Sequence, residues 1–465
     1  MGLFSTLFGI TAMATKATVS ASMFTGNALQ QGFINVRSQR ELKKMRENIA
    51  ASNSQNRMVL VMPEVDQTQL CLTEAMQDTD VYECVYNGNN AAYDYIYGAA
   101  PQTEAMIVSG GDSIHRCKAL EPFIKKSLRE ELPVVFLYTG DKEVEKTVGY
   151  INVNTEIVSK NDFYYDVFRG MTAEDVSDLL YDLYKELHSD STKPAISYFL
   201  KALTEVIMNK NASVSVNDIA NFPVNDFKKE LDDLKKNDCL NTSEYKEIEQ
   251  YYLSGLSESL DVMVFLRDLN RQFSMVFGNQ SGNSCNVKRI LNQKGIIAFN
   301  VGKTNNEMVV DLIVKHLKLC KMQNKDFNLV IDGIEVSKHE NIKDLLKLCT
   351  FAISHNDYIA SLYGGNKDGE HLFTEIMGDI SVTVLLNHPS GVSCEKWSEY
   401  MGKYKKLHIN YNTSQQNTGI MGSNVTNGIS LEEKEEPRIR GETINHIRLP
   451  TACIYRTDEI LIANL

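Results

Sequence analysis

The sequence predicts an α/β protein in which a mostly parallel sheet, flanked by helices, is interrupted by an all-helical insertion domain. In the first and last parts of the chain, short apolar runs alternate with amphipathic stretches, as in parallel sheets. Between these parts, residues 172–293 show apolar residues at three- and four-residue spacing and almost no strand pattern. The insertion therefore divides the sheet-forming sequence in two.

The first sheet-forming part spans residues 57–171 and follows a leader with a basic helix or linker at 1–56. Each apolar run here is long enough to cross a sheet once, and most are followed by helical spacing. The expected strands are 58–62, 81–86, 105–109 and 133–138, and the expected helices are 67–77, 90–97 and 115–130. Such alternation is typical of parallel strands joined by helical crossovers.

The insertion begins at a clear helix start signal. Thr172 precedes Glu174 and Asp175, which favours a capped helix with acidic residues in its first turn. Further helices are expected at 194–210, 224–236, 242–256 and 258–277.

The second sheet-forming part spans residues 294–465. Its strands are largely apolar, as buried parallel strands are. They are expected at 296–300, 327–331, 350–354 and 380–386, with two short closing strands around 452–455 and 459–463. The polar and then acidic run 411–436 predicts a mobile loop.

Composition limits the classes of function. The 465 residues carry a formal net charge of −12, so no broad basic patch is available, and any contact with nucleic acid has to be local. The nine cysteines are scattered without a C-x-x-C pair, which argues against structural zinc and a disulfide scaffold. A reducing cytoplasm fits this pattern best.

The N-terminal leader leaves its role open. Its apolar run, Gly2–Met13, is followed by Lys16 and is short for a membrane span. We expect a disordered, interfacial or partner-binding leader, and association of residues 1–30 with a membrane stays an alternative.

The run from Met58 to Leu72 has the layout of a phosphate-binding loop without its chemistry. An apolar strand leads through a short loop to an amphipathic helix. A working loop is rich in glycine and ends in Lys-Ser/Thr. This one contains neither glycine nor lysine, and its acidic residues would repel a triphosphate. The residues of this degenerate loop are Pro63, Glu64, Asp66 and Thr68.

A second candidate is the aspartate at the end of the apolar strand 327–331. Asp332 lies where P-loop NTPases hold Mg²⁺, so it is a candidate metal ligand. The position that usually carries a catalytic glutamate is Gly333, and Glu335 would take that direction only if the strand continued. The alternative is an Asp-Gly turn that ends a core strand.

Two weaker candidates follow other strands. Gly302, Lys303 and Thr304 stand between a strand and a helix, which is the context of a P-loop, but the preceding loop is too short to wrap a phosphate. A helix N-terminus there could still attract an anion. His355 ends the strand 350–354 and could be an acid, a base or a phosphate sensor, or a hydrogen-bonded surface or interface residue.

In their order, these elements resemble the TraG/TraD-type coupling proteins of conjugative type IV secretion, in the FtsK–HerA group of RecA-like motor ATPases. The resemblance covers roughly residues 57–465 and lies in order and spacing. The runs that carry it, after the strand, loop and helix at 58–72, are KPAISYFLKALTEVIMNKNASVSVNDIANF, GIIAFNVGKTNNEMVVDLIVKHLKL, LVIDGIE, FAISHNDYIASLYGG, LLNHPSGVSCEKWSEYMGKY and EPRIRGETINHIRLPTACIYRTDEILIANL.

The resemblance implies a RecA-like sheet that forms oligomers, with a ring as one form. It also implies that protein partners from a secretion apparatus bind through the helical insertion at residues 172–293. It implies, finally, that Arg438 and Arg440, which precede the closing strands, lie at a subunit interface. The departures from the family pattern point to lost catalysis: the loop has no lysine, the glutamate position is Gly333 and the sensor position is His355.

We therefore expect a catalytically degenerate scaffold or adaptor of a conjugation, secretion or mobile-element system, with no cofactor. The alternative is an active NTPase that translocates DNA or protein, binding ATP through Lys303 and Thr304 and Mg²⁺ through Asp332. A third reading is a plain α/β binding protein unrelated to motors.

Overall fold

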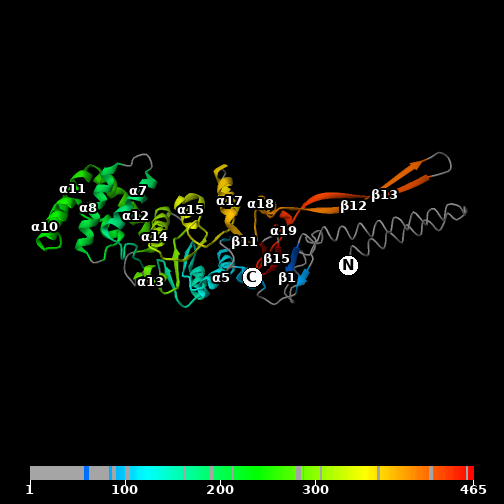
Figure 1. Cartoon of the computed structure of the whole chain (residues 1–465), viewed down its shortest axis with the longest axis horizontal. Coiled ribbons are helices and arrows are strands. Elements are labelled where there is room, and N and C mark those ends of the chain that lie inside the picture. Colours follow the sequence, from blue (N-terminus) through cyan, green and yellow to red (C-terminus); the bar gives the residue numbers. More distant parts are fainter. Residues whose placement is uncertain are drawn as a thin grey trace. The chain divides into compact units, whose positions relative to one another are not determined.

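A computed structural model shows the predicted class of fold: a mostly parallel sheet with helices against both faces and a separate group of helices inserted in the chain (Figure 1). The structure describes residues 57–61, 83–85, 91–99, 105–160, 164–188, 193–211, 213–278, 284–285, 287–303, 306–363, 367–417, 423–456 and 459–465. The α/β prediction is confirmed.

The main sheet has eleven strands in the order β2-β1-β15-β14-β11-β3-β10-β9-β4-β8-β5. The seven strands from β11 to β5 pair in parallel, whereas β14 is antiparallel to both β11 and β15. The strands are β1 (Arg57–Val61), β2 (Glu83–Val85), β3 (Ala105–Ser109), β4 (Val134–Tyr138), β5 (Thr155–Val158), β8 (Ile296–Asn300), β9 (Asn328–Asp332), β10 (Phe351–His355), β11 (Ile380–Leu385), β14 (Thr451–Arg456) and β15 (Glu459–Asn464).

Both faces of this sheet are apolar, because its central strands are buried on both sides. Successive residues belong to different core clusters: Ile107 faces one and Met106 the other. On one face lie α4 (Ala91–Ala99), α5 (Ser113–Arg129) and α6 (Lys142–Ile151), and on the other lies α14 (Glu307–Met322). The central strands are therefore packed between two apolar cores, which fix the positions of the residues at their ends.

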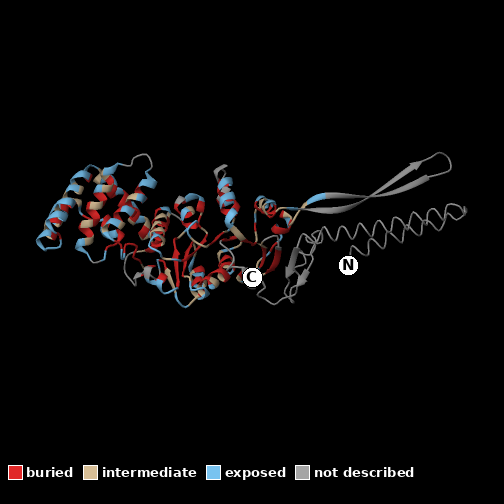
Figure 2. Ribbon diagram, in the orientation of Figure 1, coloured by how far each residue is buried: buried red, intermediate tan, exposed pale blue. Residues whose placement is uncertain are grey.

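The inserted helices form their own bundle, whose buried residues face inward and continue into one of the cores of the sheet (Figure 2). The chain enters through β6 (Tyr164–Tyr165) and leaves through β7 (Ser284–Cys285), and these short strands pair in parallel. The helices are α7 (Ala173–Leu187), α8 (Pro194–Lys210), α9 (Val216–Ala220), α10 (Phe227–Lys236), α11 (Thr242–Gly255) and α12 (Ser259–Phe277). The predicted cap is present, since Thr172 and Asp175 form a capping box at α7.

A buried aromatic cluster holds the base of the bundle against the sheet. Tyr165 stacks on Phe273 and meets Phe299 edge-on, and its hydroxyl lies 2.6 Å from Nδ1 of His316. These contacts join β6 to α12, β8 and α14. Tyr165 on β6 and Cys285 on β7, where the chain enters and leaves the bundle, are both part of the core.

The remaining α-helices are α13 (Val287–Asn292), α15 (Glu340–Leu346), α16 (Tyr358–Tyr363), α17 (Lys367–Asp379), α18 (Gly391–Met401) and α19 (Gly441–Asn445). None of the helices that the structure describes is long and apolar enough to span a membrane.

The expectation of a loop at 411–436 is wrong. β12 (Lys403–Asn417) and β13 (Ser423–Pro437) form a long antiparallel hairpin, in a compact unit separate from the one that contains the main sheet. The physical reason is visible in the sequence. Leu407, Ile409 and Tyr411 alternate with polar residues, which is the two-residue period of a strand, although the segment as a whole is polar.

Candidate functional site

The candidate site lies at the carboxyl edge of the sheet, where ligands bind in open α/β folds. Asp332 is the last residue of β9, and Ser354 lies opposite it on β10. On the other side of β10, β3 ends at Ser109 and leads through Gly110, Gly111 and Asp112 into α5. Strand β3, the turn at Gly110 and Gly111, and helix α5 therefore form the strand, glycine turn and helix that lie near Asp332.

The assignment of the phosphate-loop position to residues after strand 58–62 is wrong. β1 lies near the far end of the sheet, between β2 and β15, with five strands between it and β9. An apolar run predicts a strand but not its place in the sheet, so several strand–turn–helix units look alike in the sequence. Pro63, Glu64, Asp66 and Thr68 lie outside the described residues.

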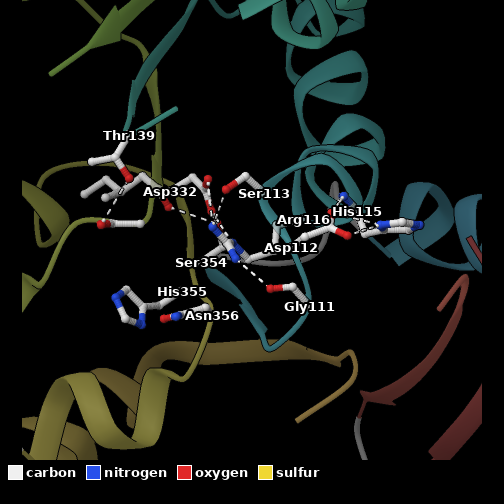
Figure 3. Close-up of polar contacts among 12 residues, drawn as sticks. Gly111, Asp112, Ser113, His115, Arg116, Thr139, Asp332, Ser354, His355 and Asn356 are labelled. Atoms are coloured by element: carbon white, nitrogen blue, oxygen red, sulfur yellow. Dashed lines mark hydrogen bonds and ion pairs between the residues drawn. The ribbon is translucent and has the colours of Figure 1, made fainter. Parts of the chain in front are cut away.

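A buried ion pair occupies the site. Arg116, in the second turn of α5, donates from Nε to Oδ1 of Asp332 at 2.5 Å and from Nη2 to Oδ2 at 3.3 Å (Figure 3). The Asp332 side chain is 0% and that of Arg116 is 5% exposed to solvent. A guanidinium stays charged in a protein, so this pair supplies the positive charge that the buried carboxylate requires.

The remaining polar atoms of the pair are also satisfied. Ser354 donates to Oδ1 of Asp332 at 2.6 Å, while Arg116 donates to the carbonyl of Gly111 at 2.9 Å and to Oγ of Ser113 at 3.0 Å. Both carboxylate oxygens thus have partners from the chain itself. A Mg²⁺ ion bound directly by Asp332 would have to displace Arg116.

The N-terminus of α5 is occupied by a carboxylate. Asp112 is the N-cap residue and accepts a hydrogen bond from the amide of His115 at 2.9 Å. The same carboxylate contacts Nδ1 of His115. A helix N-terminus attracts anions, and here the attraction is used by the cap. No lysine stands between Ser109 and Arg116 to reach a phosphate.

The space next to Gly110, the first glycine of the turn after β3, is also filled by the chain. Gly110 has φ +91°, and a Cβ built there would lie 2.8 Å from the ring of His388 and from the carbonyl of Asn387. The chain itself therefore fills the space next to the backbone of Gly110. The glycine serves close packing of the chain against itself.

A buried Ser–His pair explains this packing. Nδ1 of His388 lies 2.8 Å from the carbonyl of Leu386 and is its donor, so Nε2 accepts from the hydroxyl of Ser109 at 2.9 Å. Ser109 in turn accepts from the amide of Tyr358 at 3.1 Å. Ser109 and His388 are both 0% exposed, so no substrate reaches them, and burial lowers the pKa of His388. The pair is structural.

His355 and Glu335 lie beside the ion pair without joining it. His355 is the last residue of β10, and its Nδ1 lies 3.1 Å from the carbonyl oxygen and 3.2 Å from the amide nitrogen of Asp357. Burial lowers the pKa of His355. β9 ends at Asp332, Gly333 turns the chain with φ +72°, and Glu335 pairs with Lys338 at 2.7 Å. The strand does not continue, so Glu335 does not replace the missing glutamate.

The second nucleotide candidate lies on another strand. Gly302 and Lys303 follow β8, which is separated from β9 by β4, so the strands are about 10 Å apart. Lys303 is exposed, and Thr304 lies outside the described residues. The structure therefore does not bring Lys303 together with Asp332 at neighbouring strand ends.

The two arginines proposed for an interface directly precede α19. Arg440 is its N-cap residue, and the amide of Arg438 donates to the carbonyl of Gly402 at 3.0 Å. Both side chains are partly exposed. Their role between subunits stays a prediction.

Sequence reasoning missed the residues that close the site. Arg116, Ser109 and His388 were not among the candidates, because their partners are more than 200 residues away in the chain. One signal was available: two glycines directly after the apolar strand 105–109, ahead of a helix. In the described part of the chain, no cluster of three or more His, Cys, Asp or Glu side chains could hold a metal ion.

The solved structures that are similar to this chain include coupling proteins, the class that its sequence resembles. The bacterial conjugative coupling protein TrwBdeltaN70 is 12% identical over 79% of this chain and 85% of its own, with a TM-score of 0.44. TrwB in complex with the ATP analogue ADPNP has a TM-score of 0.46, with 12% identity over 79% and 86%. VirB4 of Thermoanaerobacter pseudethanolicus has a TM-score of 0.38, with 10% identity over 64% and 81%.

No protein-family model matches the sequence, and no curated protein matches it.

Proposed function

We propose that this protein is a catalytically silent, coupling-protein-like scaffold that works through protein partners. The observation that carries this proposal is the ion pair between Arg116 and Asp332. Arg116 supplies to Asp332 the positive charge that Mg²⁺ would supply in an active enzyme. The resemblance in the order of sequence elements supports a place in a conjugation or secretion system.

Breaking the pair to admit a nucleotide would be costly. Removing one partner from a buried ion pair costs about 3–5 kcal/mol, because the other charge stays buried. A nucleotide would also have to displace the Asp112 cap from α5 and the His388 ring from Gly110. Three independent features of the edge therefore oppose binding.

The helical domain is the expected partner surface. Between Ala173 and Phe277 the sequence contains 19 acidic and 11 basic residues, a formal charge of −8 out of −12 for the chain. An acidic domain repels the phosphate backbone of nucleic acids. Its chemistry favours proteins with basic surfaces.

ATP hydrolysis measured on purified full-length protein tests the proposal. We expect the same rate for the wild type, the Asp332→Asn variant and the Lys303→Ala variant, equal to that of a sample without protein. Hydrolysis by the wild type that Lys303→Ala or Asp332→Asn abolishes would favour the alternative of an active NTPase.

A further inference from the structure

Helices α4 and α5 carry a cluster of two tyrosines and three cationic side chains, all partly or fully exposed. Tyr93 and Tyr97 stack one helical turn apart on α4, with ring centroids 6.0 Å apart and an angle of 13° between the ring planes. Lys125 lies over the ring of Tyr93 at 5.8 Å, and Lys126 lies over that of Tyr97 at 4.9 Å. Nη1 of Arg129 donates to the hydroxyl oxygen of Tyr97 at 3.0 Å. The aromatic side chains of α4 thus hold the cations of α5 in place.

Two of these three cations have no acidic partner among the residues that the structure describes. Lys125 is neutralised by Glu121, one turn earlier on α5, at 2.5 Å. Lys126 and Arg129 make only their contacts with Tyr97. Both stand in the last turn of α5, where the helix dipole favours positive charge. The dipole does not account for a tyrosine that fixes the two side chains.

The polar groups around Tyr97 are suited to bind an anion. Its hydroxyl oxygen accepts from Arg129, so its own hydrogen is available for another acceptor. Lys126 lies over the same ring, so an ammonium, a guanidinium and a hydroxyl are gathered at one side chain. Such donors bind carboxylates and phosphates through charge-assisted hydrogen bonds.

The arrangement of the rings argues against single-stranded nucleic acid as the ligand. Proteins that bind single strands stack bases on open aromatic faces. Here each tyrosine stacks on the other and has a lysine over its ring. A bilayer is disfavoured because none of the large apolar side chains described in α4 and α5 is exposed to anchor in it. Carboxylates of a protein need only the cations and the hydroxyl.

We propose that Tyr97, Lys126 and Arg129 form a docking site for an acidic segment of a partner protein. Arg129 and the hydroxyl of Tyr97 bind one carboxylate, and Lys126 binds the next along the segment. Exposed charges contribute little when they are mobile, but side chains that are already held in place lose less entropy on binding. The site lies at the opposite end of α5 from Arg116, so this inference does not depend on whether the nucleotide site is silent.

Fluorescence anisotropy of a labelled hexaglutamate peptide, titrated with the full-length protein at low ionic strength, tests the site. We expect saturable binding, with a dissociation constant that Arg129→Gln and Lys126→Gln each raise at least about fivefold. Tyr97→Phe keeps the ring beneath Lys126 and removes only the hydroxyl, so it should raise the constant roughly threefold. The matched control is Lys118→Gln, which removes the same charge from an exposed position of α5 and should change binding less than about twofold.

Three results would overturn the proposal. The first is no binding of the peptide by the wild type. The second is an equal loss in Lys118→Gln and Arg129→Gln, because the peptide would then respond only to the total charge of the surface. The third is a single-stranded oligothymidylate, or vesicles of phosphatidylcholine and phosphatidylserine, that bind more tightly than the peptide and are released by Arg129→Gln. That result would assign the cluster to nucleic acid or to a lipid surface.

Discussion

Arg116 is the residue on which the proposal of a silent nucleotide site rests. A buried carboxylate needs a positive partner, and in this chain a guanidinium supplies it permanently. A metal ion could leave and return with nucleotide, whereas Arg116 is covalently part of α5. The pair therefore joins α5 to β9 and keeps the edge of the sheet in one state.

The stability of the protein should depend strongly on this arginine. Arg116→Ala leaves Asp332 buried without its cation, and we expect a loss of about 3–5 kcal/mol in the free energy of unfolding. Urea unfolding followed by circular dichroism measures it. The matched control is Lys118→Ala, an exposed residue on the same helix, which should change stability by less than about 0.5 kcal/mol. Equal effects of the two variants would contradict a structural role for the pair.

Two histidines with lowered pKa values predict acid sensitivity. Burial lowers the pKa of His388 and His355 in the folded state. As the pH falls through about 6.5, the unfolded chain binds protons that the folded chain does not, so the free energy of unfolding decreases. The limit is about 1.4 kcal/mol per pH unit for each histidine.

Unfolding in urea at pH 7.5 and pH 5.5 checks this dependence. His388→Gln should lose less stability between the two pH values than the wild type does. Burial raises the pKa of Asp166 and Glu205, which acts in the opposite sense, but both variants share these groups. A loss in His388→Gln as large as in the wild type would show that His388 does not carry the effect.

At the residue scale, the sequence revealed one half of the ion pair. Asp332 could be found because it ends an apolar strand, which is a local signal. Arg116 could not be found, because its charge is buried inside an amphipathic helix and its partner lies 216 residues away. Only the strand order brings them together.

Elements were predictable where one local pattern decides them. The strands expected at 105–109 and 296–300 are present with those bounds, because buried strands are short apolar runs. The order of strands is set by tertiary packing, which explains the misplaced phosphate loop after strand 58–62. The hairpin β12–β13 was missed because its alternation is diluted by polar residues.

Close packing in the helical domain predicts the effect of one small residue. A Cβ at Gly255, at the end of α11, would lie 2.4 Å from the backbone nitrogen of Phe199 on α8. Gly255→Ala should therefore force the helices apart and cost about 1–3 kcal/mol, measured by urea unfolding.

The control for this change is a helical glycine with free space. A Cβ at Gly378, in α17, has no neighbour within 4 Å, so Gly378→Ala should stabilise the protein by about 0.5–1 kcal/mol. If Gly255→Ala stabilised the protein as well, the packing of α11 on α8 would be looser than described.

At the scale of the whole molecule, the chain combines an acidic helical domain with a sheet whose carboxyl edge holds the ion pair between Arg116 and Asp332. The buried contacts of Tyr165 with Phe273 and Phe299 join the base of that domain to the sheet. In the proposed scaffold, the ion pair between Arg116 and Asp332 fixes this edge of the sheet whether or not nucleotide is present. The free surfaces, and not a chemical cycle, then carry the proposed scaffold function.

Calorimetric titration of ATP with Mg²⁺ into the full-length protein tests this account most directly. We expect no heat of binding at millimolar nucleotide, for the wild type and for Asp332→Ala alike. Saturable, Mg²⁺-dependent binding by the wild type that Asp332→Ala abolishes would contradict the account, because Asp332 would then hold a metal in place of Arg116.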